Sequence, residues 1–149
     1  MNILLSQMSL LDLENIKNIL STDFDDFWNY NILKQELLNL NSMYIIAKDG
    51  EKVVGFGGIW ENIEDIHITN IVVKKDLRNL GIGGLILEKL IDIANSKSKN
   101  LTLEVSENNI SAIKLYEKYK FKNLGIRKNY YNNTDDAIIM TLEMYDLYQ

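Results

Sequence analysis

Residues 66–94 read IHITNIVVKKDLRNLGIGGLILEKLIDIA, and their periodicity changes twice along the segment. The first part, 66–73, is rich in β-branched residues, which favour a strand. The last part, 85–94, has apolar residues at helical spacing. Between them lies the glycine-rich turn 78–84 (RNLGIGG). A strand, a glycine turn and a helix in this order place unpaired backbone N–H groups around a helix start, where a phosphate can bind.

The segments on either side continue the alternation of strands and helices. Two apolar runs joined by a turn with Asp49 and Gly50 are typical of a β-hairpin. The expected elements are a strand at 1–6, helices at about 9–20 and 29–40, hairpin strands at 43–47 and 52–60, the central strand 66–73, the helix 85–94, a strand at 101–105, a helix from Asn108 or Asn109 to about Tyr119, and strands at 121–128 and 136–143. The expected fold class is α/β (α+β), with a mixed central sheet of about seven strands flanked by about four helices.

Length and composition favour one soluble domain over residues 1–149. The chain has 149 residues, of which 46% are hydrophobic and 25% charged, as is usual for globular proteins. It has no cysteine, which excludes disulfides and thiolate metal sites. His67 is the only histidine, so a zinc site has no His pair, and we expect no metal. The net charge of -5 argues against nucleic-acid binding.

The first residues lack the features of a targeting or membrane segment. Residues 1–7 (MNILLSQ) have neither a positively charged flank nor a small-residue cleavage site. No apolar run approaches the ~18 residues that span a bilayer. We therefore expect a cytoplasmic protein without a membrane partner.

The glycine turn at 78–84 allows several interpretations. A P-loop needs Lys and Ser/Thr after its last glycine, whereas Leu85 and Ile86 follow Gly84, so nucleotide hydrolysis is excluded. A dinucleotide-binding turn needs a glycine at the sixth position from Gly81, where Ile86 stands. Taken alone, the turn also suits a structural connection that binds no ligand.

The same turn resembles the acyl-CoA pyrophosphate loop of the GNAT superfamily of N-acetyltransferases, with its spacing Arg-x-x-Gly-x-Gly between an apolar strand and an amphipathic helix. Here that spacing runs from Arg78 to Gly83. Residues 101–117 (LTLEVSENNISAIKLYE) resemble the later strand and helix of the superfamily, including its pattern Asn-x-x-Ala-x-x-Leu-Tyr. A narrower resemblance, from about residue 44 to 144, is to the bacterial RimI subgroup of ribosomal-protein-alanine N-acetyltransferases. The segments that carry it are 68–73, 103–105, 126–131 and 136–140.

The resemblance implies acetyl-CoA as the cosubstrate and assigns its contacts. In the family the pantetheine arm pairs with the central strand as an added strand would, and the pyrophosphate lies on the amides of the glycine turn. Asn109 matches a family residue at the cofactor, although a helix cap suits this position equally well. The positions assigned to the cofactor in this way are Ile71, Val72, Val73, Asn79, Leu80, Gly81, Ile82, Gly83, Gly84 and Asn109.

The resemblance also implies a direct transfer, in which a neutral amine attacks the thioester and CoA leaves as a thiolate. Such a transfer needs a base for the amine proton, a donor for the oxyanion and an acid for the thiolate. Glu104 matches the family's general base, acting through water, and Tyr116 matches the acid. A backbone N–H near Val73 is the expected oxyanion donor. Judged without the resemblance, Glu104 has the pattern of a solvent-facing strand residue, and Tyr116 and Tyr119 that of core aromatics.

The expected acceptor is the N-terminal amine of a protein, with a small-subunit ribosomal protein as the candidate. An α-amino group has a reference pKa of about 7.7–8.0 and a Lys amine one of about 10.4, so a carboxylate of modest basicity suits the α-amine better. The acidic net charge suits a basic substrate. A small-molecule amine, a Lys side chain and a non-catalytic acyl-CoA-binding regulator are the alternatives. The residues expected to line the acceptor groove are Trp60, Asn70, Tyr130 and Tyr131, and the sequence gives no oligomeric state.

One departure from the family pattern is visible after the second motif. Family members usually carry Leu-Gly-Phe there, and the glycine ends the helix, whereas this chain has Tyr119, Lys120 and Phe121. Either Lys120 adopts a left-handed conformation or the helix ends in another way.

Overall fold

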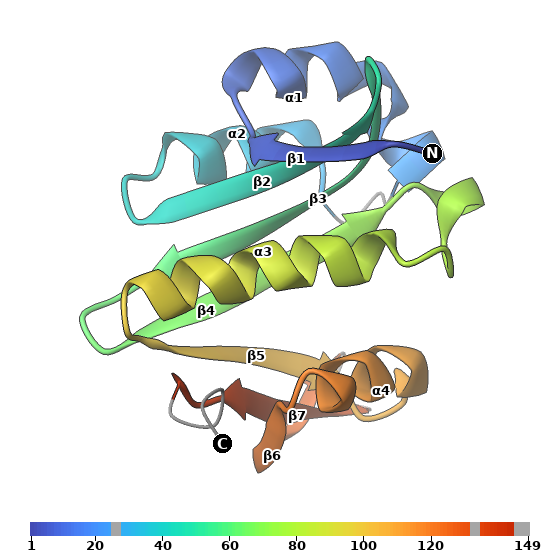
Figure 1. The fold of residues 1–149 in the computed structure, drawn as a ribbon. Coiled ribbons are helices and arrows are strands. Elements are labelled where there is room, and N and C mark those ends of the chain that lie inside the picture. Colours follow the sequence, from blue (N-terminus) through green and yellow to red (C-terminus); the bar gives the residue numbers. More distant parts are fainter. Residues whose placement is uncertain (25–27, 132–134, 145–149) are drawn as a thin grey trace.

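Seven strands form one mixed sheet in the order β1-β2-β3-β4-β5-β7-β6 in the computed structural model (Figure 1). The structure describes residues 1–24, 28–131 and 135–144, and only the backbone of residues 129–131. The pair β4 and β5 is parallel, and all other neighbours in the sheet are antiparallel. This confirms the expected seven-stranded mixed sheet. The strands are β1 (Ile3–Gln7), β2 (Ser42–Asp49), β3 (Lys52–Glu61), β4 (Asp65–Val73), β5 (Asn100–Ser106), β6 (Lys122–Tyr131) and β7 (Asp135–Leu142).

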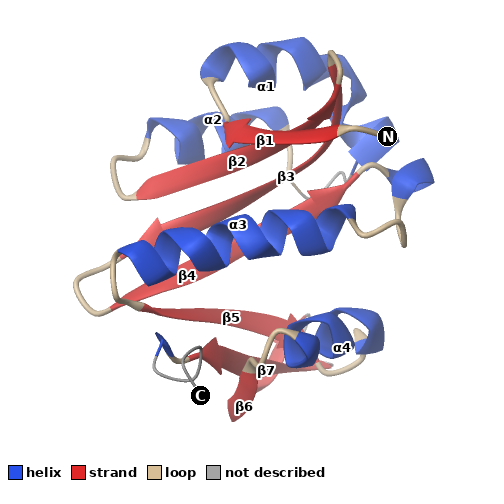
Figure 2. Cartoon of the chain, in the orientation of Figure 1, coloured by secondary structure: helices blue, strands red, loops and turns tan. Residues whose placement is uncertain are grey.

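Helices cover both faces of the sheet (Figure 2). Along β2, Ile45 and Ala47 join a core with α3, while Tyr44 and Ile46 join a second core with α1 and α2. Because side chains alternate along a strand, one strand supplies both layers. The helices are α1 (Leu10–Ile16), α2 (Tyr30–Leu38), α3 (Ile82–Ser96) and α4 (Ile110–Lys118). Within the described ranges, none of these helices combines the length and apolar character needed to cross a membrane.

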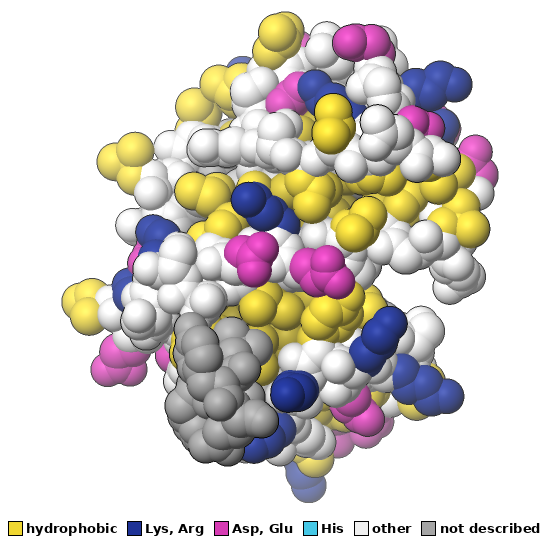
Figure 3. Space-filling view, in the orientation of Figure 1, with side chains coloured by type: hydrophobic (Ala, Val, Ile, Leu, Met, Phe, Trp, Pro, Cys, Tyr) yellow, Lys and Arg dark blue, Asp and Glu magenta, His cyan; other side chains and the backbone are white. Residues whose placement is uncertain are grey.

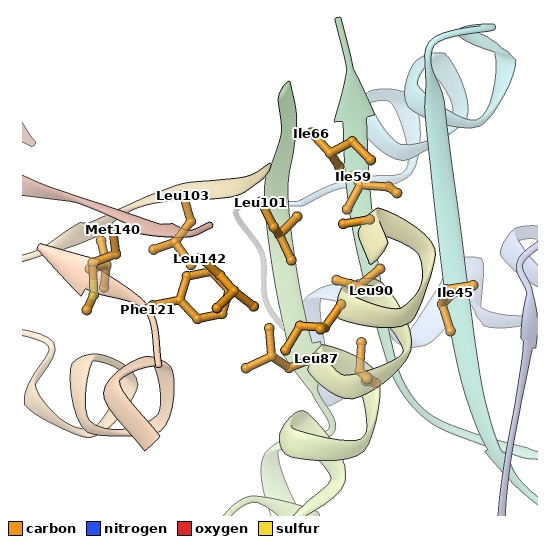
Figure 4. Packing of buried hydrophobic residues seen from close by; sticks show 14 of the residues in the cluster. Ile45, Ile59, Ile66, Leu87, Leu90, Leu101, Leu103, Phe121, Met140 and Leu142 are labelled. Atoms are coloured by element: carbon orange, nitrogen blue, oxygen red, sulfur yellow. The ribbon is translucent and has the colours of Figure 1, made fainter. Parts of the chain in front are cut away.

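The larger core lies between α3 and the middle of the sheet (Figure 4). Leu87 and Leu90 of α3 point toward strand residues of this core, and both are fully buried. Phe121, which follows α4, packs into the same core, so α4 is fixed on the same face as α3. The helical pattern at 85–94 predicted α3, but the helix begins earlier, at Ile82, because two glycines of the turn form part of its first turn.

The predicted helix at 9–20 is wrong in its second half. Only α1 is α-helical, and it begins with a capping box in which Ser9 and Asp12 exchange hydrogen bonds. A 3₁₀ turn (Lys17–Ile19) and a π-helical turn (Leu20–Phe24) follow it. Leu20 and Phe24 are buried in the same core as Leu13 and Ile16 of α1. A continuous α-helix would give the same three- and four-residue spacing, so the apolar pattern alone does not reveal the change of helix type.

The sheet opens between β4 and β5. The two strands pair only from Asp65 to His67 on β4 and from Asn100 to Thr102 on β5. The β3–β4 register also shifts, so that Thr69 is an extra residue on β4, and such a bulge increases the local bend of a strand. Beyond His67, the β5-facing edge of β4 has no strand partner in the described part of the chain.

The end of α4 confirms a left-handed Lys120, with φ +73°. The amide of Phe121 donates to the carbonyl of Tyr116 (3.1 Å) and the amide of Lys120 donates to that of Glu117 (2.9 Å). These two bonds form a Schellman motif, which an apolar contact usually accompanies. Here the rings of Tyr116 and Phe121 supply that contact, with centroids 5.6 Å apart. The helix end therefore holds Tyr116 in place without the usual glycine.

Candidate active site

A cleft of about 640 Å³ lies where the end of β4, the glycine turn and α4 meet. In Figure 3 the surface is hollowed on the side where the start of α3 faces α4, and dark-blue basic side chains lie over α4. The lining residues are Ile71, Val72, Val73, Leu77, Arg78, Asn79, Gly81, Ile82, Gly83, Gly84, Asn109, Ser111, Ala112, Lys114, Leu115, Tyr116 and Lys118.

The glycine turn presents backbone donors to this cleft. Gly81 has φ +89°, a conformation that other residues adopt only with strain, and it forms the N-cap of α3. The first helical hydrogen bond runs from the amide of Leu85 to the carbonyl of Gly81 (3.1 Å). Within the described residues, the amides at 82–84 donate to no backbone carbonyl outside the helix. Such free N–H groups at a helix start suit a phosphate or pyrophosphate.

Arg78, the first residue of the motif, ties the turn to the protein. Its Nε donates to the carbonyl of Val73 (3.1 Å), and its Nη2 donates to the carbonyl of Phe24 (3.1 Å). The guanidinium thus joins the end of β4 to the segment after α1. This part of the motif has a structural role that its resemblance to a pyrophosphate loop did not predict.

The edge of β4 that faces the cleft has alternate backbone groups available. The amide of Lys74 donates to the carbonyl of Val54 (2.9 Å), and Val72 lies opposite Phe56 in the antiparallel β3–β4 pair. In an antiparallel pair, successive residues direct their backbone groups to opposite sides. Ile71 and Val73 therefore turn theirs toward the gap beside β5. A ligand with amide groups can pair with this edge as an added strand does.

The two tyrosines of α4 have different surroundings. Tyr116 lines the cleft. Tyr119 instead donates from its hydroxyl to Glu88 of α3 (2.7 Å), and this bond, together with burial, raises the pKa of Tyr119 to about 12. An added Cβ at Gly84 would lie 3.2 Å from that hydroxyl, so the glycine allows α4 to approach α3. Of the two tyrosines, only Tyr116 lines the cleft.

Asn109 is a helix cap and also lines the cleft. Its side chain accepts a hydrogen bond from the amide of Ala112 (3.3 Å) and so caps α4. The same residue lines the cleft. The cap fixes the start of the helix that carries Tyr116.

Glu104 lies on the opposite face of the sheet from the cleft. Its neighbours Leu103 and Val105 are buried in the core under α3, so the side chain of Glu104 points the other way. It is 26% exposed, and its Oε1 lies 2.8 Å from Nη2 of Arg127. Glu104 does not line the cleft itself but stands beside the gap between β4 and β5.

The same face carries Trp60, His67 and Asn70. Trp60 lies opposite His67 in the β3–β4 pair, and their rings are 5.6 Å apart. His67 Nε2 is hydrogen-bonded to Nδ2 of Asn62 (3.2 Å). Asn70 is only 9% exposed, and in the described part of the chain its Nδ2 is buried without a hydrogen-bond partner. Such a group costs about 1–3 kcal/mol unless a partner arrives.

The hydroxyls of Tyr44 and Thr69 form a part-buried pair next to Asn70. The hydroxyls of Tyr44 and Thr69 are 3.3 Å apart, and that of Thr69 donates to Oδ1 of Asn70 (3.4 Å). Burial raises the pKa of Tyr44 to about 12, so this hydroxyl stays protonated near neutral pH. The oxygen of the Asn70 amide is therefore engaged, which orients its nitrogen.

The structure brings most of the predicted cofactor residues together in the cleft. Leu80 is the exception, since it does not line the cleft and is 59% exposed. The side chains of Tyr130 and Tyr131 lie outside the described residues. The cleft-lining residues that the sequence did not predict are Leu77, Arg78, Ser111, Ala112, Lys114, Leu115 and Lys118. Those on α4 recur every three or four positions, so the helical period of this segment was the signal for them.

The site shows no arrangement for a metal. In the parts of the chain that the structure describes, no group of three or more His, Cys, Asp or Glu side chains is placed to hold one.

Comparison with known proteins assigns the family. The model of the acetyltransferase (GNAT) family matches residues 9–121, and the chain belongs to this family. A ribosomal protein bS18-alanine N-acetyltransferase from Haemophilus influenzae is 31% identical over 144 residues, which cover 92% of this chain and 96% of that protein.

Solved structures agree with this assignment. The ribosomal-protein-S18-alanine N-acetyltransferase from Escherichia coli has a TM-score of 0.85 and 28% identity, covering 96% of this chain and 94% of that one. A GNAT family acetyltransferase from Elizabethkingia anophelis with acetyl-CoA bound has a TM-score of 0.73 and 25% identity, covering 95% and 98%. The chain is thus an acetyl-CoA-dependent N-acetyltransferase, and within the family it is similar to the RimI enzymes.

Proposed function

We propose that this enzyme transfers the acetyl group of acetyl-CoA to the N-terminal α-amine of a protein, with Glu104 as general base and Tyr116 as general acid. The proposal rests on the arrangement of these two side chains around the opening between β4 and β5. Tyr116 lines the cleft on the α4 side, and Glu104 points to the other face. A thioester lying in the opening has its sulfur near one group and its acetyl carbon within reach of the other.

The cleft suits acetyl-CoA along its whole length. The free amides at 82–84 would hold the pyrophosphate. The backbone of Ile71 and the carbonyl of Val73, which also accepts from Arg78, would pair with the pantetheine amides. Lys114 and Lys118 line the same cleft from α4 and supply positive charge for further phosphate oxygens. Acetyl-CoA supplies the acetyl group as a thioester, which a nitrogen nucleophile can attack without a covalent enzyme intermediate.

The protein then has to move two protons. The amine nitrogen forms a bond to the acetyl carbon as the carbon–sulfur bond breaks. Glu104, directly or through a water, takes the proton that the nitrogen loses, and the hydroxyl of Tyr116 gives a proton to the leaving sulfur. The amide of Val73 points away from β3, into the opening, and is the donor we assign to the carbonyl oxygen as charge develops on it.

Asn70 favours an α-amine over a Lys side chain as acceptor. In an N-terminal residue the carbonyl oxygen is only two bonds beyond the carbon that bears the amine, whereas a Lys ε-amine has no such oxygen near it. The unpartnered Nδ2 of Asn70 lies on the acceptor side of β4. Because it is buried, the side chain would have to turn toward the groove to donate to this oxygen, and this bond would satisfy it. Trp60, on the same face, would form an apolar wall of the groove.

A ribosomal protein is the acceptor class that the relatives suggest. The names of the enzymes from Haemophilus influenzae and Escherichia coli specify the alanine of ribosomal protein S18 as their acceptor. The net charge of -5 on this chain suits a basic protein of this kind.

The test is acetyl-CoA turnover, followed as free thiol, with three acceptors: a peptide with a free N-terminal alanine, a Lys peptide blocked at its N-terminus, and spermidine. We expect turnover on the first only. Glu104→Gln and Tyr116→Phe should each reduce kcat by about 10²-fold or more. Their matched controls are Glu107→Gln, at an exposed position past β5, and Tyr119→Phe, whose hydroxyl bonds to Glu88. Turnover on spermidine or the Lys peptide alone would replace the proposed acceptor, and unchanged kcat in either variant would remove that residue from the mechanism.

A further inference from the structure

The carboxylate of Glu104 is paired with a cation from a strand two places away in the sheet. Arg127 lies on β6 opposite Ala137 of β7, and Glu104 lies on β5 opposite Ile139 of β7. The guanidinium therefore crosses over β7 to reach Oε1 of Glu104 at 2.8 Å. The small, fully buried Ala137 at the crossing leaves room for this path.

An ordinary surface ion pair is the alternative explanation. Such pairs contribute little to stability, about 0–1 kcal/mol. Arg127 is 52% exposed, which fits that description, but Glu104 is only 26% exposed and stands beside the opening in the sheet. This long-range contact from an edge strand adds little to stability, but it places a positive charge beside the proposed base.

We propose that Arg127 is a positioning residue for Glu104, an inference that rests on the proposed role of Glu104 as the base. The guanidinium holds one carboxylate oxygen and leaves the other for the acceptor. It also offsets the negative charge of Glu104, which would otherwise favour binding of the acceptor as an ammonium ion. An α-amine with a pKa of about 7.7–8.0 is mostly an ammonium at pH 7, and the ammonium cannot attack the thioester.

This charge balance predicts that loss of Arg127 affects kcat and the acceptor KM differently. Without Arg127, the carboxylate of Glu104 would bind the ammonium form of the acceptor more tightly. Its own orientation for proton removal would also be less well fixed. Loss of Arg127 should therefore lower kcat without raising the KM of the acceptor. A residue that only stabilises the sheet would instead leave kcat unchanged per folded molecule.

The experiment compares Arg127→Met, Arg127→Lys and Lys128→Met at saturating acetyl-CoA with the N-terminal alanine peptide. Lys128 is the matched control, because it is the next residue on the same strand, carries the same charge and is exposed. We expect kcat to fall about 10- to 100-fold in Arg127→Met, part of the 10²–10⁴ that a general base supplies. The acceptor KM should stay level or fall. Arg127→Lys should recover part of the loss, and Lys128→Met should match the wild type.

The same substitution in a Glu104→Gln background separates the two proposals. If Arg127 acts through Glu104, Arg127→Met has almost no further effect once the carboxylate is gone. An equal loss in both backgrounds, or an unchanged kcat in Arg127→Met while Glu104→Gln is impaired, would overturn the role of Arg127 alone. An unchanged kcat in Glu104→Gln would overturn the base assignment itself. A thermal melt of each variant confirms that the rates refer to folded protein.

Discussion

Gly83→Ala distinguishes a ligand-binding glycine turn from one that serves the fold only. Gly83 is in the first turn of α3, and its φ is not in the left-handed region. A Cβ added there would lie 3.7 Å from Val73 Cγ2 and 4.0 Å from Ile71 Cγ2, which are ordinary contact distances. The protein therefore has room for the methyl group. The same methyl would, however, project between α3 and the edge of β4, where the cleft lies.

The two effects have opposite signs. Replacing a helical glycine by alanine stabilises the fold by about 0.5–1 kcal/mol, which for a chain of this size corresponds to a Tm roughly 1–4 °C higher. Losing one hydrogen bond to a charged phosphate costs about 1.5–3 kcal/mol. That loss corresponds to acetyl-CoA binding roughly 10- to 150-fold weaker. We expect a protein that is more stable and yet binds its cosubstrate less well.

Thermal melting without ligand and titration calorimetry with CoA measure the two effects separately. Gly81→Ala is the comparison, because φ at Gly81 is +89° and alanine there costs about 1–2 kcal/mol of stability. If Gly83→Ala binds CoA with wild-type affinity, the turn does not hold the pyrophosphate, and our reading of the cleft is wrong at this point. A lower Tm in Gly83→Ala would show that the fold has no room for the methyl group at this position.

Three further predictions test other parts of the structure. Lys120→Gly should raise Tm by roughly 1–4 °C, because the left-handed strain of about 1–2 kcal/mol exceeds the entropic cost of glycine, about 0.5–1 kcal/mol. Lys120→Ala should not raise Tm, and equal Tm values for the two variants would contradict the prediction. Replacing both Lys114 and Lys118 by Glu should raise the KM for acetyl-CoA about tenfold, with a smaller effect in high salt, and a salt-independent effect would refute a charge contact. Burial alone raises the pKa of Asp12, but hydrogen bonds from Lys48 and Ser9 outweigh it and the pKa lies below its ordinary value. The stability that the charged Asp12 contributes is therefore present above about pH 4 and is lost as pH falls through the lowered pKa. Asp12→Asn should cost about 0.5–2 kcal/mol in urea melts at pH 7, and this cost should shrink as the pH is lowered below about 4.

The sequence predicted the parts of the fold that depend on local patterns. Short-range periodicity and turn residues predicted the strand, glycine turn and helix at 66–94 and the hairpin around Gly50. They also predicted where the later strands lie along the chain, but not their order in the sheet. The start of α3 was placed late because glycine has a low helix propensity, so a glycine-rich first turn does not look helical. Comparison with the family pattern left two possibilities at Lys120, a left-handed conformation or a different helix end, and the structure has the first.

The rest depends on strand register, which local patterns do not specify. Nothing near Glu104 in the sequence indicates Arg127, because the pairing of β5, β7 and β6 brings them together. The missing partner of Asn70 depends on the bulge at Thr69 and on burial beneath other elements. Both features concern contacts between segments far apart in the chain.

The opening between β4 and β5 also constrains where an acid and a base can come from. Side chains along β5 alternate between the α3 core and the opposite face, so Glu104, placed between Leu103 and Val105, cannot reach the α4 side. A proton donor for the leaving sulfur must then come from an element that covers that side of the sheet. Tyr116 meets this requirement because the Schellman motif at Lys120 and the Asn109 cap fix both ends of α4. Shortening α4 at either end should therefore impair the proposed acid function, whereas the amides at 82–84 at the start of α3 would remain in place for the pyrophosphate.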